Sequence, residues 1–176
     1  VEQMGYAADD PRRRVVGLLN PLSEEQSVLR TSLVPALLET IRRNLDLRAG
    51  DLALFEVGKV FWARAGEPQP DEPSRLAGGF SGLGQPASWH AGEKPVVFAT
   101  VRGAVEYRCQ GLGLPAPELR PGADSPYLDP DISARVLLAG RDLGELGLLA
   151  GPAAKAFDLD RPVYLFDLDF DLLAEL

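Results

Sequence analysis

The sequence is poor in the side chains that carry metal and redox chemistry. Its 176 residues include a single cysteine, Cys109, and a single histidine, His90. These counts exclude an internal disulfide and leave too few nitrogen and sulfur ligands for a zinc site. We expect Cys109 to lie on the buried face of a helix, which suits a reducing compartment such as the cytoplasm. His90 is expected to be exposed in a loop.

Positive charge and long apolar runs are also scarce. The chain has 26 acidic against 18 basic side chains, for a formal net charge of -8. This balance opposes binding to nucleic acid, because that affinity comes largely from Lys and Arg. We interpret the one basic run, Arg12, Arg13 and Arg14, as a solvated edge. No stretch approaches the about 20 apolar residues that span a bilayer. Hydrophobic residues at 45% indicate a globular domain with a core.

The remaining candidate motifs do not complete a catalytic or metal site. Asp167, Asp169 and Asp171 alternate with apolar residues and are predicted to share one face of a strand. They lack the turn glycine and distant glutamate of a calcium loop, so we interpret them as a solvated face. Gly78, Gly79, Gly82 and Gly84 match no phosphate-binding loop. We therefore predict no catalytic, cofactor-binding or metal residue in this chain.

Two adjoining segments give the strongest structural signal. Apolar residues at 33, 34, 37, 38, 41 and 45 recur with helical period, with Pro35 in the first turn and Thr31 or Ser32 available as a cap. From 52 to 62 the period changes to two, which predicts a central strand or a long arm of a bent hairpin. Gly58 within it predicts a bulge or a close approach to a neighbouring backbone.

The fold class predicted from all segments is α+β, with a mainly antiparallel sheet flanked by helices in a single domain, 1–176. Loops are expected at about 63–74, 82–94 and 115–130. The other predicted elements are a buried strand at 15–19, a connection at 20–30, a strand at 75–81, a helix from Pro95 to Gly111, strands at 133–138 and 143–149, a short helix from Pro152 to Phe157, and a last strand at 163–170.

Several sequence motifs occur in the order seen in a known family. They are NPLSEEQSVLRTSLVPALLETIRRN followed by LALFEVGKVF, then ARVLLAGRDLGELG, and finally KAFDLDRPVYLFDLDFDLL. Over about residues 10–176 the chain resembles the catalytic-like module of the bacterial phenylalanyl-tRNA synthetase beta subunit. The resemblance implies the fold of a class II synthetase core that has lost its catalytic arginines. Consistent with that loss, Phe61 is followed by Trp62 where a working site carries an arginine. Two family histidines are replaced, at Asp129 and Ala150.

The resemblance also implies a role. The chain is expected to be a fragment of a longer beta subunit and to have no catalytic action of its own. It is expected to dock on the catalytic alpha subunit in a cytoplasmic (αβ)2 enzyme that attaches phenylalanine to its tRNA. ATP and magnesium would be bound by the alpha subunit, and tRNA would be met only through the whole enzyme.

Two other functions stay open at this stage. One is a free-standing enzyme or small-molecule-binding domain with a class II-like cleft, in which Arg30, Glu56 and Arg135 would form a polar constellation. Arg30 and Glu56 are also predicted to form a structural ion pair, which is the commoner role of paired charges. The other is a nucleic-acid-binding module, favoured only by association with tRNA.

Overall fold

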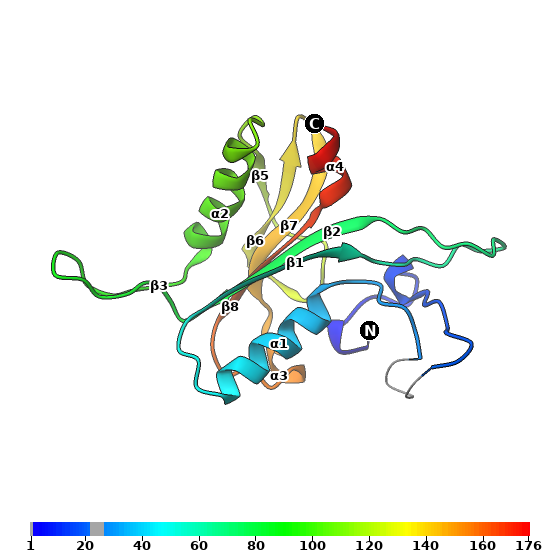
Figure 1. Ribbon diagram of the computed structural model, residues 1–176, viewed down its shortest axis with the longest axis horizontal. Coiled ribbons are helices and arrows are strands. Elements are labelled where there is room, and N and C mark those ends of the chain that lie inside the picture. Colours follow the sequence, from blue (N-terminus) through cyan, green and yellow to red (C-terminus); the bar gives the residue numbers. More distant parts are fainter. Residues whose placement is uncertain (1, 22–26) are drawn as a thin grey trace.

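The computed structural model describes residues 2–21 and 27–176 and has an α+β fold. Six antiparallel strands form one sheet in the order β1-β2-β8-β7-β6-β5. Helices α1 and α3 lie on one side of the sheet, and α2 and α4 on the other (Figure 1). The predicted fold class is therefore confirmed. The elements are β1 Leu52–Lys59, β2 Ser74–Ser81, β5 Glu118–Pro121, β6 Leu128–Leu138, β7 Arg141–Leu149, β8 Val163–Asp169, α1 Val34–Asp46, α2 Phe98–Gly111, α3 Gly151–Ala156 and α4 Phe170–Glu175, with short 3-10 turns at Glu2–Met4 and Pro11–Arg13.

Helix α1 anchors the core on its side of the sheet. Its buried face includes Leu38 and Ile41, both 0% exposed. Gly79 of β2 makes room for it, because a Cβ there would lie 2.6 Å from the Ile41 Cδ1 atom. Ser32 supplies a local contact at the helix start, where its Oγ accepts a hydrogen bond from the Val34 backbone N–H at 3.2 Å. The predicted helix is confirmed.

Helix α2 anchors the second core on the opposite face. Val101, Val105 and Cys109 are its buried residues, and Cys109 is 1% exposed, as predicted. The helix begins at Phe98 rather than at Pro95. The reason is local, because the Thr100 hydroxyl accepts a hydrogen bond from the Val97 backbone N–H at 3.1 Å and so caps the helix there. No helix within the described residues is long and apolar enough to cross a membrane.

Strand β1 lies at the edge of the sheet and not at its centre. It forms a hairpin arm with β2, and the register between them is unbroken through Gly58 and its partner Arg75. The predicted bulge at Gly58 is therefore wrong. The close approach there is made by a side chain, since a Cβ on Gly58 would collide with the Arg30 guanidinium.

The predicted buried strand at 15–19 is also wrong. Among the described residues, the segment is paired only through an isolated bridge between Gly17 and Val28, and Leu19 is 98% exposed. The segment lies outside the six-stranded sheet, so the strands of that sheet do not bury its apolar side chains. The expected connection at 20–30 falls partly outside the described residues.

Three segments hold more regular structure than the sequence indicated. The expected loop at 82–94 contains β3 Leu83–Gln85 and β4 Lys94–Pro95, which pair in a sheet of their own. The expected link at 115–130 contains β5 and the start of β6, where the register shifts between Leu128 and Ser133. The last strand turns into α4 at Phe170, because the Asp169 Oδ1 atom accepts a hydrogen bond from the Leu172 N–H at 2.9 Å and caps a new helix.

Candidate functional site

A row of polar side chains crosses the sheet on the face that carries α1. Residues paired directly across antiparallel strands place their side chains on the same face. On this face the core beneath α1 ends at Leu165, and two residues later on β8 the polar row begins. The row follows the register from β1 to β6, with Glu56 opposite Ala77, Ala77 opposite Asp167, Asp167 opposite Glu145, and Glu145 opposite Arg135.

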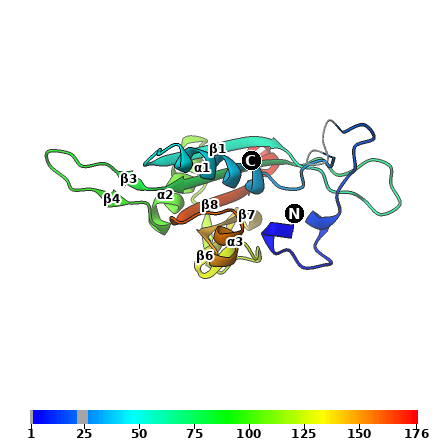
Figure 2. The same ribbon diagram turned by 90° about the horizontal axis from the view of Figure 1, so that it is seen from below.

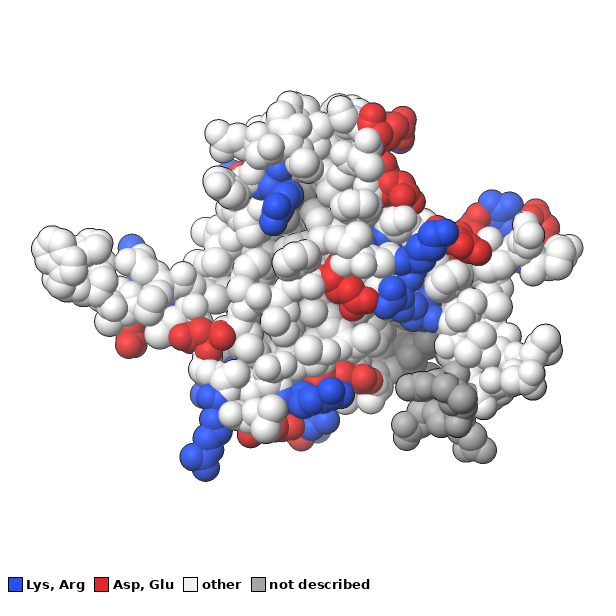
Figure 3. All heavy atoms as spheres, viewed as in Figure 1, with Lys and Arg blue, Asp and Glu red and all other residues white. Residues whose placement is uncertain are grey.

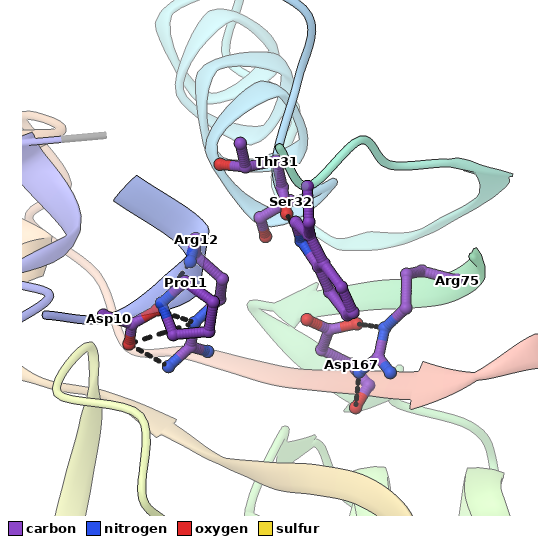
Figure 4. Close-up of a pocket in the computed structure, with 8 residues that line it drawn as sticks. Asp10, Pro11, Arg12, Thr31, Ser32, Arg75 and Asp167 are labelled. Atoms are coloured by element: carbon purple, nitrogen blue, oxygen red, sulfur yellow. Dashed lines mark hydrogen bonds and ion pairs between the residues drawn. The ribbon is translucent and has the colours of Figure 1, made fainter. Parts of the chain in front are cut away.

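The centre of the row is an ion pair between Arg75 of β2 and Asp167 of β8 (Figure 4). The Arg75 Nε–H donates to the Asp167 Oδ1 atom at 3.0 Å, and Nη2 donates to the Asp167 backbone oxygen at 3.3 Å. The side chains are 18% and 13% exposed, respectively. Burial raises the pKa of the Asp167 carboxyl, and the nearby Arg75 charge offsets part of that rise. This pair joins β2 to β8 in a largely desolvated setting.

The three alternating aspartates do not form the solvated strand face that the sequence predicted. Asp167 is held by Arg75, while Asp169 caps α4. Asp171 lies within α4 and accepts a hydrogen bond from the Ser74 backbone N–H at 2.8 Å. The strand ends at Asp169, so the strict alternation is lost. Within residues 2–21 and 27–176, no three His, Cys, Asp or Glu side chains are grouped to hold a metal ion.

The N-terminal segment lies over this part of the sheet and contributes a second arginine, Arg12. Its guanidinium stacks on the Tyr6 ring, 4.2 Å from the centroid. It also forms an ion pair with Asp10 at 2.8 Å and donates from Nη1 to the Ser125 hydroxyl at 3.0 Å. The interpretation of residues 12–14 as a solvated edge is wrong for Arg12, whose side chain is 24% exposed. Burial raises the pKa of Tyr6 to about 12, so its phenol is neutral at physiological pH.

Trp62 closes one side of the hollow between these two arginines. Its indole N–H donates to the Thr31 backbone oxygen at 2.9 Å, which fixes the ring. The hollow, lined also by Arg12, Arg75 and Asp167, encloses about 240 Å³. Small-molecule pockets commonly enclose roughly 300–1,000 Å³. A neighbouring hollow of about 360 Å³ shares the same three charged residues. In both hollows, Arg75 and Asp167 already pair with each other, and Arg12 is already paired with Asp10.

Of the three residues considered for a small-molecule site, Arg30, Glu56 and Arg135, only the first two lie together. Arg30 and Glu56 meet at 2.5 Å, as predicted for a structural pair, and the Arg30 Nε–H also donates to the Lys59 backbone oxygen at 2.8 Å. Arg135 is separated from them by three strands of the sheet. It pairs instead with Asp124 at 3.1 Å and with Asp142. The three residues do not converge on one ligand.

The other singled-out positions have local roles. Asp129 accepts hydrogen bonds at Oδ1 from the backbone N–H groups of Asp131 and Ile132, at 2.9 and 3.1 Å. Ala150 precedes α3 and donates its backbone N–H to the Tyr127 oxygen at 2.8 Å. His90 is exposed at a hairpin tip, as expected. The two positions where the resemblance implied a lost histidine thus form ordinary turn and helix-start contacts in this chain.

Arg75 and Glu145 were not singled out from the sequence. Arg75 stands near the start of a strand whose other residues are apolar, glycine or serine, in the segment SRLAGGFS. A lone charge in such a strand indicates a buried partner of opposite sign. That signal could have identified Arg75. The partner on β8 could not have been chosen without knowing that β2 and β8 are neighbours.

Comparisons with known proteins agree with this architecture. The family model described as the phenylalanyl tRNA synthetase beta chain CLM domain matches residues 1–170. The phenylalanine–tRNA ligase beta subunit of Syntrophotalea carbinolica is 37% identical over 172 residues, and that of Geobacter metallireducens is 36% identical over 174. The aligned regions cover 98% and 99% of this chain but 21% and 22% of those proteins, so the chain spans about a fifth of the length of these curated relatives.

A solved structure gives the likeness in three dimensions. Pyrrolysyl-tRNA synthetase from Desulfitobacterium hafniense superposes with a TM-score of 0.69 at 18% identity, covering 98% of this chain and 56% of that one. At this identity the likeness concerns the fold alone, and it confirms the predicted class II synthetase core. Because the family model matches residues 1–170, nearly the whole chain, the chain belongs to the phenylalanyl-tRNA synthetase beta chain family, as its CLM domain.

Proposed function

We propose that this chain is a non-catalytic structural module of the beta subunit of phenylalanine–tRNA ligase. Its role is to dock on the catalytic alpha subunit in an (αβ)2 enzyme that attaches phenylalanine to its tRNA. The observation behind the proposed absence of catalysis is that the arginines lining the hollow are already paired. Arg12 and Arg75 each contact a carboxylate of this chain, and Trp62, which follows β1, closes one side of the hollow. Binding a nucleotide phosphate requires guanidinium groups that are available to donate hydrogen bonds to it.

The docking role is supported by β1, which is an edge strand of the six-stranded sheet. On β1, alternate residues Ala53, Phe55 and Val57 point away from α1, and Phe55 and Val57 are 69% and 45% exposed. An edge strand offers unpaired backbone groups to another chain, and apolar side chains beside it favour that contact. We name Ala53, Phe55 and Val57 the β1 stripe. A partner lying along the β1 stripe would cover both its backbone and its apolar side chains.

The docking role can be tested with two serine substitutions in the full-length beta subunit. Phe55→Ser with Val57→Ser removes the apolar part of the β1 stripe while keeping the strand. We expect capture of the alpha subunit to fall sharply, with little change in the melting temperature of the variant alone. Leu19→Ser, at another highly exposed apolar residue, is the matched control. Unchanged capture by the double variant would exclude the β1 stripe as the docking surface.

The non-catalytic role can be tested by calorimetry on the isolated chain. We expect no heat of binding with ATP, magnesium and phenylalanine, singly or together, because the arginines that line the hollow are already paired with carboxylates of this chain. Binding at micromolar ligand would instead favour the small-molecule-binding domain.

Nucleic-acid binding by this chain can be tested by a gel shift with tRNA. The face of the molecule seen in Figure 3 shows acidic and basic side chains intermixed. A polyanion is expected to bind poorly to such a surface. A tRNA shift that disappears when Arg12, Arg13 and Arg14 are changed to Ala would support the nucleic-acid alternative.

A further inference from the structure

The hairpin of β3 and β4 forms an arm that leaves the body of the molecule (Figures 1 and 2). Beyond the paired strands, a tight turn closes its tip. The Ser88 backbone N–H donates to the Ala91 oxygen at 2.8 Å, and the Ala91 N–H donates back to Ser88 at 3.3 Å. Trp89 and His90 are the two central residues of this turn. The backbone at the tip is therefore ordered before any partner arrives.

The composition of the arm is unusual for a segment that stands in water. Residues 82–92 include no Asp, Glu, Lys or Arg. Charged residues make up 25% of the chain as a whole, close to the average of globular proteins. The outer end of the arm accordingly lacks red and blue in Figure 3. Depletion of charge together with enrichment of tryptophan is the compositional signature of the core of a protein interface.

Trp89 is the most prominent side chain of the arm. It is 96% exposed, and its ring lies 4.9 Å from that of His90 at an angle of 64°. A large side chain on a preformed turn loses little conformational entropy when it is bound. An isolated two-stranded hairpin is at best marginally stable in water, so a partner that covers it would also stabilise it. These features favour a role for Trp89 as the side chain that anchors the arm to a partner.

We propose that the arm inserts Trp89 into an apolar pocket of a second protein subunit, in which a carbonyl or carboxylate oxygen accepts the indole N–H. A polyanion is a poor occupant, because the arm offers it no Lys or Arg between residues 82 and 92. The body of this domain is a poor occupant too, because the arm points away from it. The inference rests on the proposed docking function and adds to it a contact on a separate element from the β1 stripe.

The test uses the full-length beta subunit assembled with its alpha subunit. Trp89→Ala should speed subunit exchange by at least about tenfold, as expected for loss of a tryptophan hot spot. The melting temperature of the beta subunit alone should not change, because the side chain has few intramolecular contacts to lose. Tyr107→Ala is the matched control, since this aromatic residue on α2 is 76% exposed. It should leave the exchange rate unaltered.

A second measurement reports the environment of the ring directly. The beta subunit is labelled with 5-fluorotryptophan, and comparison with Trp89→Phe identifies the Trp89 fluorine resonance. We expect a solvent-exposed resonance in the beta subunit alone and a shifted, protected one after the alpha subunit is added. Protection already present in the beta subunit alone would overturn the proposal, since the same chain would then cover Trp89. Weakened tRNA binding without faster exchange would overturn it too.

The two proposals fail in different ways. If serine substitutions in the β1 stripe weaken assembly and Trp89→Ala does not, docking stands and the anchor is wrong. If neither weakens assembly, both are wrong.

Discussion

Removing the Asp167 carboxylate should destabilise the sheet at its centre. In Asp167→Ala, the Arg75 guanidinium would keep its largely buried place between β2 and β8 without its partner. Breaking a buried ion pair from one side commonly costs about 3–5 kcal/mol. Two features of the structure reduce that figure here. The Arg75 side chain is 18% exposed, and Glu145, directly across from Asp167 on β7, lines the same hollow as Arg75 and offers a second carboxylate near it. We therefore expect a loss of about 2–3 kcal/mol in the free energy of unfolding.

The same structure makes a contrasting prediction for the double variant Arg75→Met with Asp167→Leu. This variant removes both charges and keeps apolar bulk between the strands. A buried ion pair replaced by packed hydrophobic residues is often neutral in stability or more stable. We expect the double variant to lie within about 1 kcal/mol of the parent chain. Urea unfolding at neutral pH, extrapolated linearly to water, measures all three free energies.

The result that would refute this reasoning is a single variant as stable as the parent. If Asp167→Ala cost less than about 0.5 kcal/mol, in the range of an ordinary surface substitution, the pair would not be a buried one. A double variant much less stable than Asp167→Ala would contradict it in another way. The polar contacts would then be essential to the sheet rather than replaceable.

Asp167 also predicts a pH dependence with a definite sign. Its pKa is raised in the folded chain, so the native state binds this proton more tightly than the unfolded chain does. The stability contributed by the group is therefore complete below its unfolded pKa and is lost as pH rises through its folded pKa. Asp167→Asn should lack this decline. A stability profile with the same slope in both proteins would assign the decline to other groups.

Four further predictions concern packing, backbone conformation and the burial of a thiol. Ile41→Ala should cost about 2–5 kcal/mol in urea unfolding, because the residue is 0% exposed, whereas exposed Glu39→Ala on the same helix should change little. Gly144→Ala should lower the melting temperature, since φ is +140° and a Cβ would collide with the β8 backbone. Gly103→Ala in α2, with open space around it, should instead stabilise by about 0.5–1 kcal/mol. Burial raises the pKa of the Cys109 thiol, so a thiol reagent at mildly alkaline pH should react only as the chain unfolds, and fast reaction in the folded state would contradict the burial.

The local parts of the fold could be predicted from the sequence. Helix α1 followed from the apolar period and from Pro35 in its first turn, and β1 followed from strict alternation. Both signals lie within a few residues, where the chain alone decides the geometry. The boundary errors arose where one side chain redirected the backbone. Thr100 moved the start of α2, and Asp169 converted the end of a strand into a helix.

The candidate site was much less accessible from the sequence. Asp167 was interpreted as solvated because alternating carboxylates usually face water, and only the neighbouring β2 makes it a buried partner of Arg75. The same limitation placed Arg135 beside Glu56, although three strands separate them. The order of strands in a sheet depends on contacts between distant segments, and one sequence carries little of that information.

The position of β8 has a consequence for how this domain is made. It is the last strand in the sequence, yet it lies between β2 and β7 and pairs with both. Until β8 has been synthesised, the earlier strands of this sheet can pair only in two separate groups, β1 with β2 and β5 with β6 and β7. Each group then has an unpaired edge where β8 will later lie. Joining them requires closure of a long chain segment, which is slow and leaves those edges available to other chains. A domain of this design is expected to need protection until β8 has been synthesised, and shortening the domain from its β8 end should harm folding more than an equal cut at its first residues.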